Sequence, residues 1–304
     1  MNYLTLKRIT TGIKISLLIC IINAIGGYSF SQNVPSSSKD QVINSTPSKR
    51  INFFIVNHVR KPGLVNRTII WRAKFHSFFH HKQFIVIVAN SAGEMSDRVI
   101  EKLNKHNARI GTIWFDSHGH YEKGYSSFTI GKNEFSYHSV CDSPFTTPIK
   151  ELSTWCDSYT NIIIGSCYGG ASYQRTNLNT GATTRMNGDS LMMCVGNLLP
   201  QSNVYGCESW IMCKPGFFSR HSYGLSGYPL QKRFRDVIFE PVWEHMGIWN
   251  HFSTNSGKIE TVNTIALNTK GALRFKSLNY LSKRKSQKLL ARHLKRLQQG
   301  VYKA

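Results

Sequence analysis

A histidine and a cysteine each follow an apolar run in the middle of this chain. His118 comes shortly after the run at residues 110–115, and Cys167 after the run at residues 161–164. β-branched and aromatic residues dominate both runs, which predicts two buried parallel strands whose carboxyl ends open into turns. Because the carboxyl ends of parallel strands share one rim of a sheet, an imidazole and a thiol would meet there. Cysteine nucleophile chemistry requires that pair.

Each residue of this predicted site has a chemical role. Cys167 would attack as the thiolate, and His118 would protonate the leaving amine and then act as base toward water. Gly119 lacks a side chain, so its backbone N–H could join that of Cys167 in an oxyanion hole. The competing interpretation is a small buried cysteine and an ordinary His-Gly turn. The catalytic interpretation is favoured because both motifs end predicted strands and both are followed by glycine.

The two motifs resemble those of a known group of peptidases. Phe-Asp-Ser-His-Gly at 115–119 and Ile-Gly-Ser-Cys-Tyr-Gly-Gly at 164–170 are similar to the His-Gly and Cys-x-Gly signatures of the caspase–gingipain–legumain group. Residues 117–210 look closest to the autoprocessing cysteine peptidase domains of large bacterial toxins and adhesin-like proteins. In those domains a hairpin follows the His strand, and a glycine-started helix and one more strand follow the Cys strand. The resemblance implies a cysteine endopeptidase with a Cys167/His118 dyad.

The resemblance also implies a specificity pocket beside the His and Cys strands and the strand after them. The candidate substrate-binding residues are the acids on those elements and the serine before the nucleophile: Asp116, Ser166, Asp189 and Glu208. The carboxylates could recognise Arg or Lys through charge-assisted hydrogen bonds. Alternatively, Asp189 caps a helix and Glu208 is solvated. Acyl-enzyme chemistry of this kind needs no metal or organic cofactor, and no His or Cys spacing matches a zinc site.

Strand and helix patterns alternate around the two motifs. Further strands are expected at 51–56, 84–88 and 203–207, a hairpin at 127–135, and helices at 91–107, 148–155 and 187–198. Residues 68–71 are expected to form a short strand or the end of a connecting segment, and 174–187 a polar loop. The predicted fold is α/β, a caspase-like, mostly parallel sheet flanked by helices, with a basic, largely helical C-terminal extension.

The chain divides into four predicted parts. These are a signal peptide at 1–31, a flexible linker at 32–50, the peptidase domain at 51–218 and the basic extension at 219–304. A basic stretch, 13 apolar residues from 15 to 27 and small residues before position 32 are typical of a cleavable export signal. We therefore expect a secreted or periplasmic protein. Export permits disulfides, and if Cys167 stays free the six cysteines left after cleavage form at most two, with connectivity open.

The charge balance indicates an acidic partner without naming it. Lys and Arg number 38 against 16 Asp and Glu, a net charge of +22. Leucines and bases alternate at 281–297, which predicts a basic amphipathic helix that could contact an anionic surface, beside the protein or peptide substrate. The contrasting function is a non-catalytic binding module of the same fold that uses its basic surface on an acidic partner or membrane. The presence of both Cys167 and His118 argues against that module.

Overall fold

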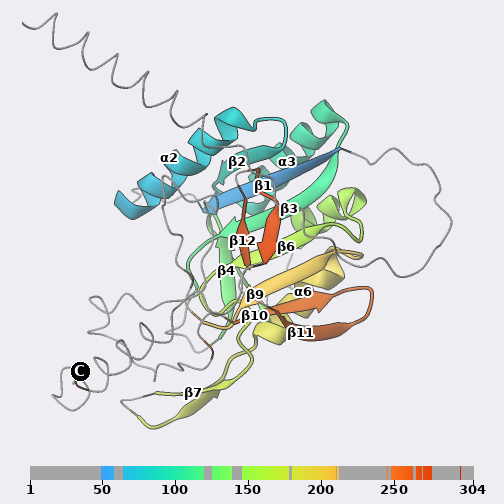
Figure 1. The fold of residues 1–304 in the computed structure, drawn as a ribbon. Coiled ribbons are helices and arrows are strands. Elements are labelled where there is room, and N and C mark those ends of the chain that lie inside the picture. The colour runs from blue at the N-terminus through green and yellow to red at the C-terminus, as the bar shows by residue number, and fades with distance from the viewer. Residues whose placement is uncertain are drawn as a thin grey trace, which may run out of the picture. The chain divides into compact units, whose positions relative to one another are not determined.

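A seven-stranded mixed sheet organises the part of the chain that the computed structural model describes (Figure 1). The described residues are 49–57, 64–119, 125–138, 146–177, 180–209, 211, 245, 248–262, 265–268, 270–275 and 295. The strand order is β11-β10-β9-β6-β3-β1-β2. Strands β2, β1, β3, β6 and β9 run parallel, while β10 is antiparallel to β9 and to β11. The bounds are β1 Arg50–Asn57, β2 Phe84–Ala89, β3 Arg109–Asp116, β6 Asn161–Gly165, β9 Asn203–Cys207, β10 Trp249–Ser253 and β11 Lys258–Val262.

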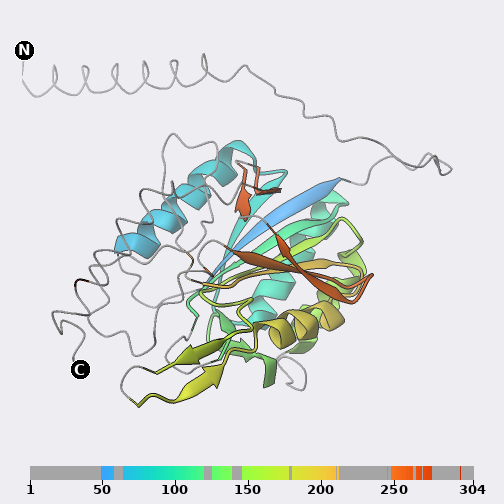
Figure 2. The same ribbon diagram turned by 60° about the horizontal axis from the view of Figure 1, so that its bottom comes forward.

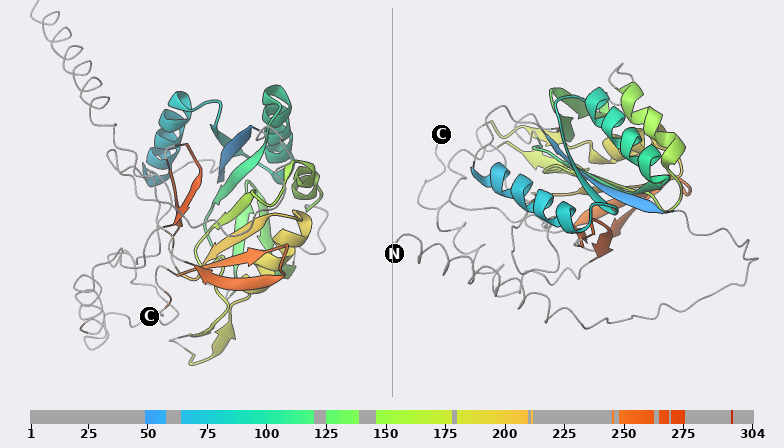
Figure 3. Two further views of the ribbon diagram at one scale, coloured as in Figure 1. Left: turned by 45° about the vertical axis from the view of Figure 1, so that its right-hand side comes forward. Right: turned by 90° about the horizontal axis from the view of Figure 1, so that it is seen from above.

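Helices cover both faces of this sheet because its central strands are apolar on both sides. In β1, Phe53 and Ile55 join the core that contains α3, whereas Phe54 and Val56 join the core that contains Ala73 of α2. In the right-hand view of Figure 3, the blue helix α2 and the teal helix α3 lie on opposite sides of the sheet. The bounds are α2 Leu64–Phe79, α3 Ala92–His106, α5 Thr147–Glu151, the 3-10 helix η3 Leu152–Trp155 and α6 Gly188–Leu198.

Three two-stranded hairpins accompany the main sheet. They are β4 Ser127–Ile130 with β5 Asn133–Ser136, β7 Gln174–Thr176 with β8 Thr183–Arg185, and β12 Ile265–Leu267 with β13 Leu273–Phe275. The β7–β8 hairpin projects from the main sheet in Figure 2. Ile265 and Leu267 of β12 pack into the same core as α2.

Most of the predicted elements are confirmed, with shifts at their ends. The two strands of the predicted site end at Asp116 and Gly165, two residues before His118 and Cys167, so both site residues lie in the loops that follow. Before residue 218, two segments differ from the predicted secondary structure. Residues 68–71 lie inside α2 rather than in a strand, and the polar segment 174–187 contains the β7–β8 hairpin.

The sheet extends beyond the boundary predicted after residue 218, because β10 and β11 are two of its strands. The described residues 248–275 of the predicted helical extension form strands β10 to β13. The predicted signal peptide, and all of the predicted basic helix at 281–297 except residue 295, lie outside the described residues. Within the described residues, no helix is long and apolar enough to cross a membrane.

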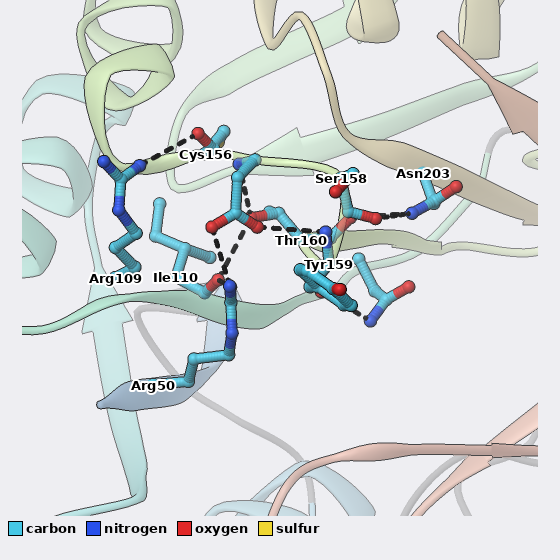
Figure 4. Close-up of polar contacts among 10 residues, drawn as sticks. Arg50, Arg109, Ile110, Cys156, Ser158, Tyr159, Thr160 and Asn203 are labelled. Atoms are coloured by element: carbon cyan, nitrogen blue, oxygen red, sulfur yellow. Dashed lines mark hydrogen bonds and ion pairs between the residues drawn. The ribbon is translucent and has the colours of Figure 1, made fainter. Parts of the chain in front are cut away.

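A polar network fixes the amino ends of the central strands (Figure 4). Arg50 at the start of β1 pairs with Asp157 at 2.6 Å and donates to the Ile110 carbonyl of β3 at 2.9 Å. Thr160, just before β6, donates to the same carbonyl at 3.0 Å. Burial would raise the pKa of Asp157, but the bonds from Arg50 and the Tyr159 N–H outweigh it and lower that pKa. The network holds the loop before β6 at the end of the sheet opposite His118 and Cys167.

Candidate active site

His118 and Cys167 follow adjacent parallel strands at the same end of the sheet. Asp116 of β3 lies in register with Gly165 of β6, and the Ser117 N–H donates to the Gly165 carbonyl at 3.3 Å. The two chains therefore remain paired up to the residues before the predicted dyad. His118 is exposed, and Cys167 is partly buried. No hydrogen bond joins these two side chains in the described part of the chain.

Gly119 brings the two loops into direct contact. A Cβ atom built on Gly119 would lie 2.0 Å from the Cys167 carbonyl oxygen and 3.0 Å from its backbone nitrogen. Since real Cβ atoms do not approach so closely, only glycine fits at this position in the observed backbone. The predicted proximity of the His-Gly and Cys motifs is therefore confirmed at the level of the backbone.

The sulfur of Cys167 lies among backbone N–H groups and near one carboxylate. Its thiol is surrounded by protein, and this burial raises its pKa. The N–H groups of Ile211, Cys167 itself and Gly119 oppose the shift, whereas the negative charge of Asp116 adds to it. The Ile211 nitrogen lies 3.4 Å from the sulfur. At rest the residue is therefore a neutral thiol at neutral pH, and a base must remove its proton before it can attack.

The charge of Asp116 provides a test of this environment. Because Asp116 raises the pKa of Cys167, Asp116→Asn is expected to lower that pKa and enlarge the thiolate fraction at neutral pH. Alkylation of Cys167 by iodoacetamide should then run severalfold faster at pH 7–8, and the two rates should converge at high pH, where both thiols are ionised. Peptide mass mapping over a pH series measures this. Asp189→Asn is the control, and an equal acceleration there would contradict the assignment.

The β4–β5 hairpin holds both loops through three serine hydroxyls. Ser117 accepts a hydrogen bond from the Thr129 N–H at 3.1 Å, and Ser166 donates to the Ser127 carbonyl at 2.7 Å. Ser126 donates to the Tyr168 carbonyl at 2.6 Å. Residues 126–129 thus fix the loop after β3 and the loop after β6, which makes the hairpin a scaffold for the site.

The turn after Cys167 has a strained backbone. Tyr168 is buried and has φ of 61°, a left-handed conformation that is uncommon for residues other than glycine. The guanidinium of Arg175 lies 4.3 Å from the centre of the Tyr168 ring, and the backbone N–H of Tyr168 donates to the Ser209 carbonyl at 2.8 Å. Strain of this kind persists where surrounding contacts over-determine it, and it clusters at functional sites.

Two of the predicted substrate-binding residues have local partners. Ser166 is fully buried, and its hydroxyl is used by the backbone of β4. Asp189 lies in the first turn of α6, where its carboxylate pairs with Arg185 at 3.3 Å and accepts from the Ser190 N–H at 2.8 Å. These contacts support the interpretation that Asp189 belongs to the start of the helix. The N-cap residue itself is Asn187.

Glu208 is buried rather than solvated, which contradicts the alternative considered for it. Its carboxylate accepts from Asn250 Nδ2 at 2.8 Å and lies 2.5 Å from His245 Nδ1. The same Asn250 nitrogen donates to the Gly170 carbonyl at 2.9 Å. Asn250 of β10 thus ties Glu208 to the loop after Cys167, and a basic substrate residue would have to displace His245 to reach the Glu208 carboxylate.

Three of the cysteines, Cys156, Cys167 and Cys207, are free thiols. Cys194 on α6 forms a disulfide bond. A free Cys167 agrees with its predicted role, and Cys194 agrees with the expectation that some cysteines are bridged. The described residues include no group of three or more His, Cys, Asp or Glu side chains that could hold a metal ion.

The sequence analysis missed two parts of this site. Ile211, whose N–H reaches the sulfur, lies 44 residues from Cys167 in the chain, and nothing in its own sequence context indicates that contact. Asn250 belongs to a strand that the sequence pattern did not reveal.

In comparisons with protein-family models, curated proteins and solved structures, the chain matches none of them.

Proposed function

We propose that this protein is a cysteine endopeptidase in which Cys167 is the nucleophile and His118 the general acid and base. The observation that carries the proposal is the backbone contact between Gly119 and Cys167 at the carboxyl ends of β3 and β6. That contact sets a histidine beside the loop of a free cysteine in a region of strained backbone. A purely structural cysteine would not need the adjacent His-Gly loop.

The reaction follows from the groups around the sulfur. His118 takes the thiol proton, and the sulfur attacks the substrate carbonyl carbon to form a tetrahedral oxyanion. The oxyanion would be held by the N–H groups of Gly119 and Cys167, both of which lie close enough to the sulfur to lower its pKa. His118 then protonates the leaving amine as the C–N bond breaks. Water, deprotonated by His118, releases the acid and restores the thiol.

The order of elements supports the caspase-like assignment within this proposal. A hairpin, β4–β5, follows the His strand, and helix α6, which starts at Gly188, followed by strand β9, comes after the Cys strand. This is the order expected of the autoprocessing peptidase domains that the motifs resemble. Export remains part of the proposal, and the disulfide at Cys194 favours an oxidising compartment.

Specificity for basic residues would depend on the three candidate acids near the site. Asp189 is paired with Arg185, Glu208 contacts His245 and Asn250, and Asp116 has contacts of its own as well. Asp116 is the candidate acid whose charge acts on the Cys167 thiol and raises its pKa. If Arg or Lys is preferred at the cleavage site, Asp116 is the residue we expect to recognise it.

Cleavage of a peptide library, followed by mass spectrometry under reducing conditions, tests the function. We expect the wild type to cleave, and Cys167→Ala and His118→Ala each to lose at least about 10³-fold in rate. Cys156→Ala is the matched control, because it removes a free cysteine at the opposite end of the sheet and should leave cleavage unchanged. Equal cleavage by wild type and Cys167→Ala would refute the proposal.

The competing function is a non-catalytic binding module. The burial that raises the pKa of Cys167 favours it, since inert structural cysteines are buried in this way. The same experiment separates the two, because a binding module would give no Cys167-dependent cleavage of any peptide or of the chain itself.

A further inference from the structure

Helix α2 has apolar side chains on two opposite faces. One face packs on the sheet, where Ala73 is fully buried and Ile70 contacts the same core. Ser77 fastens this face through a hydrogen bond from its hydroxyl to the Phe84 carbonyl of β2 at 3.0 Å. These contacts involve only one face of the helix, and the second apolar face takes no part in them.

The second face is a stripe of exposed aromatic rings. Trp71, Phe75, Phe78 and Phe79 are 52%, 42%, 76% and 60% exposed. At about 100° of rotation per residue, these four positions fall within roughly a third of the helix circumference, opposite Ala73. The rings contact one another, with centroids 5.8 Å apart for Trp71–Phe75, 5.1 Å for Phe75–Phe79 and 5.3 Å for Phe78–Phe79. We call these four residues the aromatic face of α2.

The aromatic face is a true patch rather than scattered exposure. Eight large hydrophobic side chains are exposed among the described residues, and four of them lie on this one helix face. Isolated exposed apolar residues are normal on soluble proteins, but contiguous patches mark contact with another apolar surface. The aromatic face is therefore a candidate contact surface, and Phe78 and Phe79 are its most exposed members.

The described charged side chains of α2 and of the turn after it are all basic. Arg67 and Lys74 are exposed and lie along one flank of the stripe, and Lys82 is exposed just beyond the helix end. From residue 41 to residue 93 the chain contains eight Lys and Arg and no Asp or Glu. A partner of matching chemistry must offer an apolar layer beneath a negatively charged surface.

We propose that the aromatic face of α2 docks on an anionic phospholipid bilayer, with the helix lying in the plane of the membrane. The aromatic rings would enter the boundary between headgroups and acyl chains, and Arg67 and Lys74 would contact the lipid phosphates. Helices with Trp and Phe on one face and bases beside them bind membrane interfaces in this way. Helix α2 itself carries no acid, and an anionic bilayer is complementary to the bases beside its aromatic face. This inference is independent of the peptidase proposal.

Co-sedimentation of the full chain with vesicles tests the proposal. We expect binding to phosphatidylcholine vesicles that contain phosphatidylserine and little binding to pure phosphatidylcholine. The double substitution Phe78→Ser with Phe79→Ser should weaken binding at least about tenfold, since two inserted rings are lost. Lys74→Glu should also weaken it, and high salt should reduce it. Tyr159→Ser, which removes an exposed ring in the loop before β6, is the matched control.

Three results would overturn the proposal. Undiminished vesicle binding by the Phe78/Phe79 variant would assign membrane contact to another part of the chain. Equal binding to neutral and anionic vesicles would remove the role of the charges. Sedimentation showing a dimer that the double variant loses, without vesicle binding by either protein, would make the aromatic face a self-association surface instead.

Discussion

Gly119→Ala should reduce peptide cleavage by at least about 100-fold while leaving the protein folded. The added methyl group would lie 2.0 Å from the carbonyl oxygen of Cys167, so the two loops must separate by about an ångström or more. Displacements of that size typically cost about 100-fold in rate when they misalign reacting groups. The loss should appear in kcat, because the oxyanion donor and the nucleophile move relative to each other.

The matched control is Gly93→Ala in helix α3, where the nearest atom to the new Cβ is 4.0 Å away. That variant should keep full activity. The folded state of Gly119→Ala is checked by thermal unfolding and by its hydrogen-exchange pattern. Normal cleavage by Gly119→Ala would mean that the contact between the two loops has no part in catalysis.

Gly170→Ala should destabilise the protein by about 3 kcal/mol, because two backbone segments have no room to separate. A Cβ on Gly170 would lie 2.4 Å from the Gly206 carbonyl oxygen and 2.5 Å from its carbon. The Gly170 N–H also donates to the Cys207 carbonyl at 2.9 Å, and separating the segments would break this hydrogen bond. Urea denaturation is expected to show a lower midpoint with an unchanged slope.

Gly93→Ala again serves as the control, and it should leave stability unchanged or raise it slightly, since alanine favours the helix. Gly206→Ala probes the same contact from β9 and should have an effect of similar size, because its Cβ would lie 2.6 Å from Gly170. Equal stability of the Gly170→Ala and Gly93→Ala variants would contradict the close approach of the Gly170 and Gly206 backbones.

The central strands could be predicted because burial on both faces leaves an unmistakable apolar run. Residues 51–56, 110–115 and 161–164 are such runs, and each lies in the sheet. Helix α3 could also be predicted, because the residue types from Ser91 onward are typical of a helix start. In the structure the Ser91 side chain accepts a hydrogen bond from the Glu94 N–H, and Asn107 at the helix end is left-handed. For the site, the same reasoning predicted His118 and Cys167 at the carboxyl ends of neighbouring strands, and in the structure both lie in the loops two residues beyond those ends.

Elements stabilised mainly by distant contacts could not be predicted. The β-branched residues at 68–70 favour a strand locally, but packing of Ala73 on the sheet makes the segment helical. Strand β11 is mostly exposed and has no apolar pattern, because its place is set by pairing with β10. Burial of Glu208 depends on Asn250 and His245, which come from sequence-distant segments.

The most direct test of the nucleophile is intact-mass analysis after incubation with a mixture of peptidyl acyloxymethyl ketones. These reagents trap a cysteine that a neighbouring histidine activates within a substrate-binding site. We expect a single adduct, mapped to Cys167, with the free thiols Cys156 and Cys207 unmodified. The adduct should be absent from the Gly119→Ala and His118→Ala variants. Labelling that avoids Cys167, or that spreads equally over all three thiols, would contradict the assignment of Cys167 as the nucleophile.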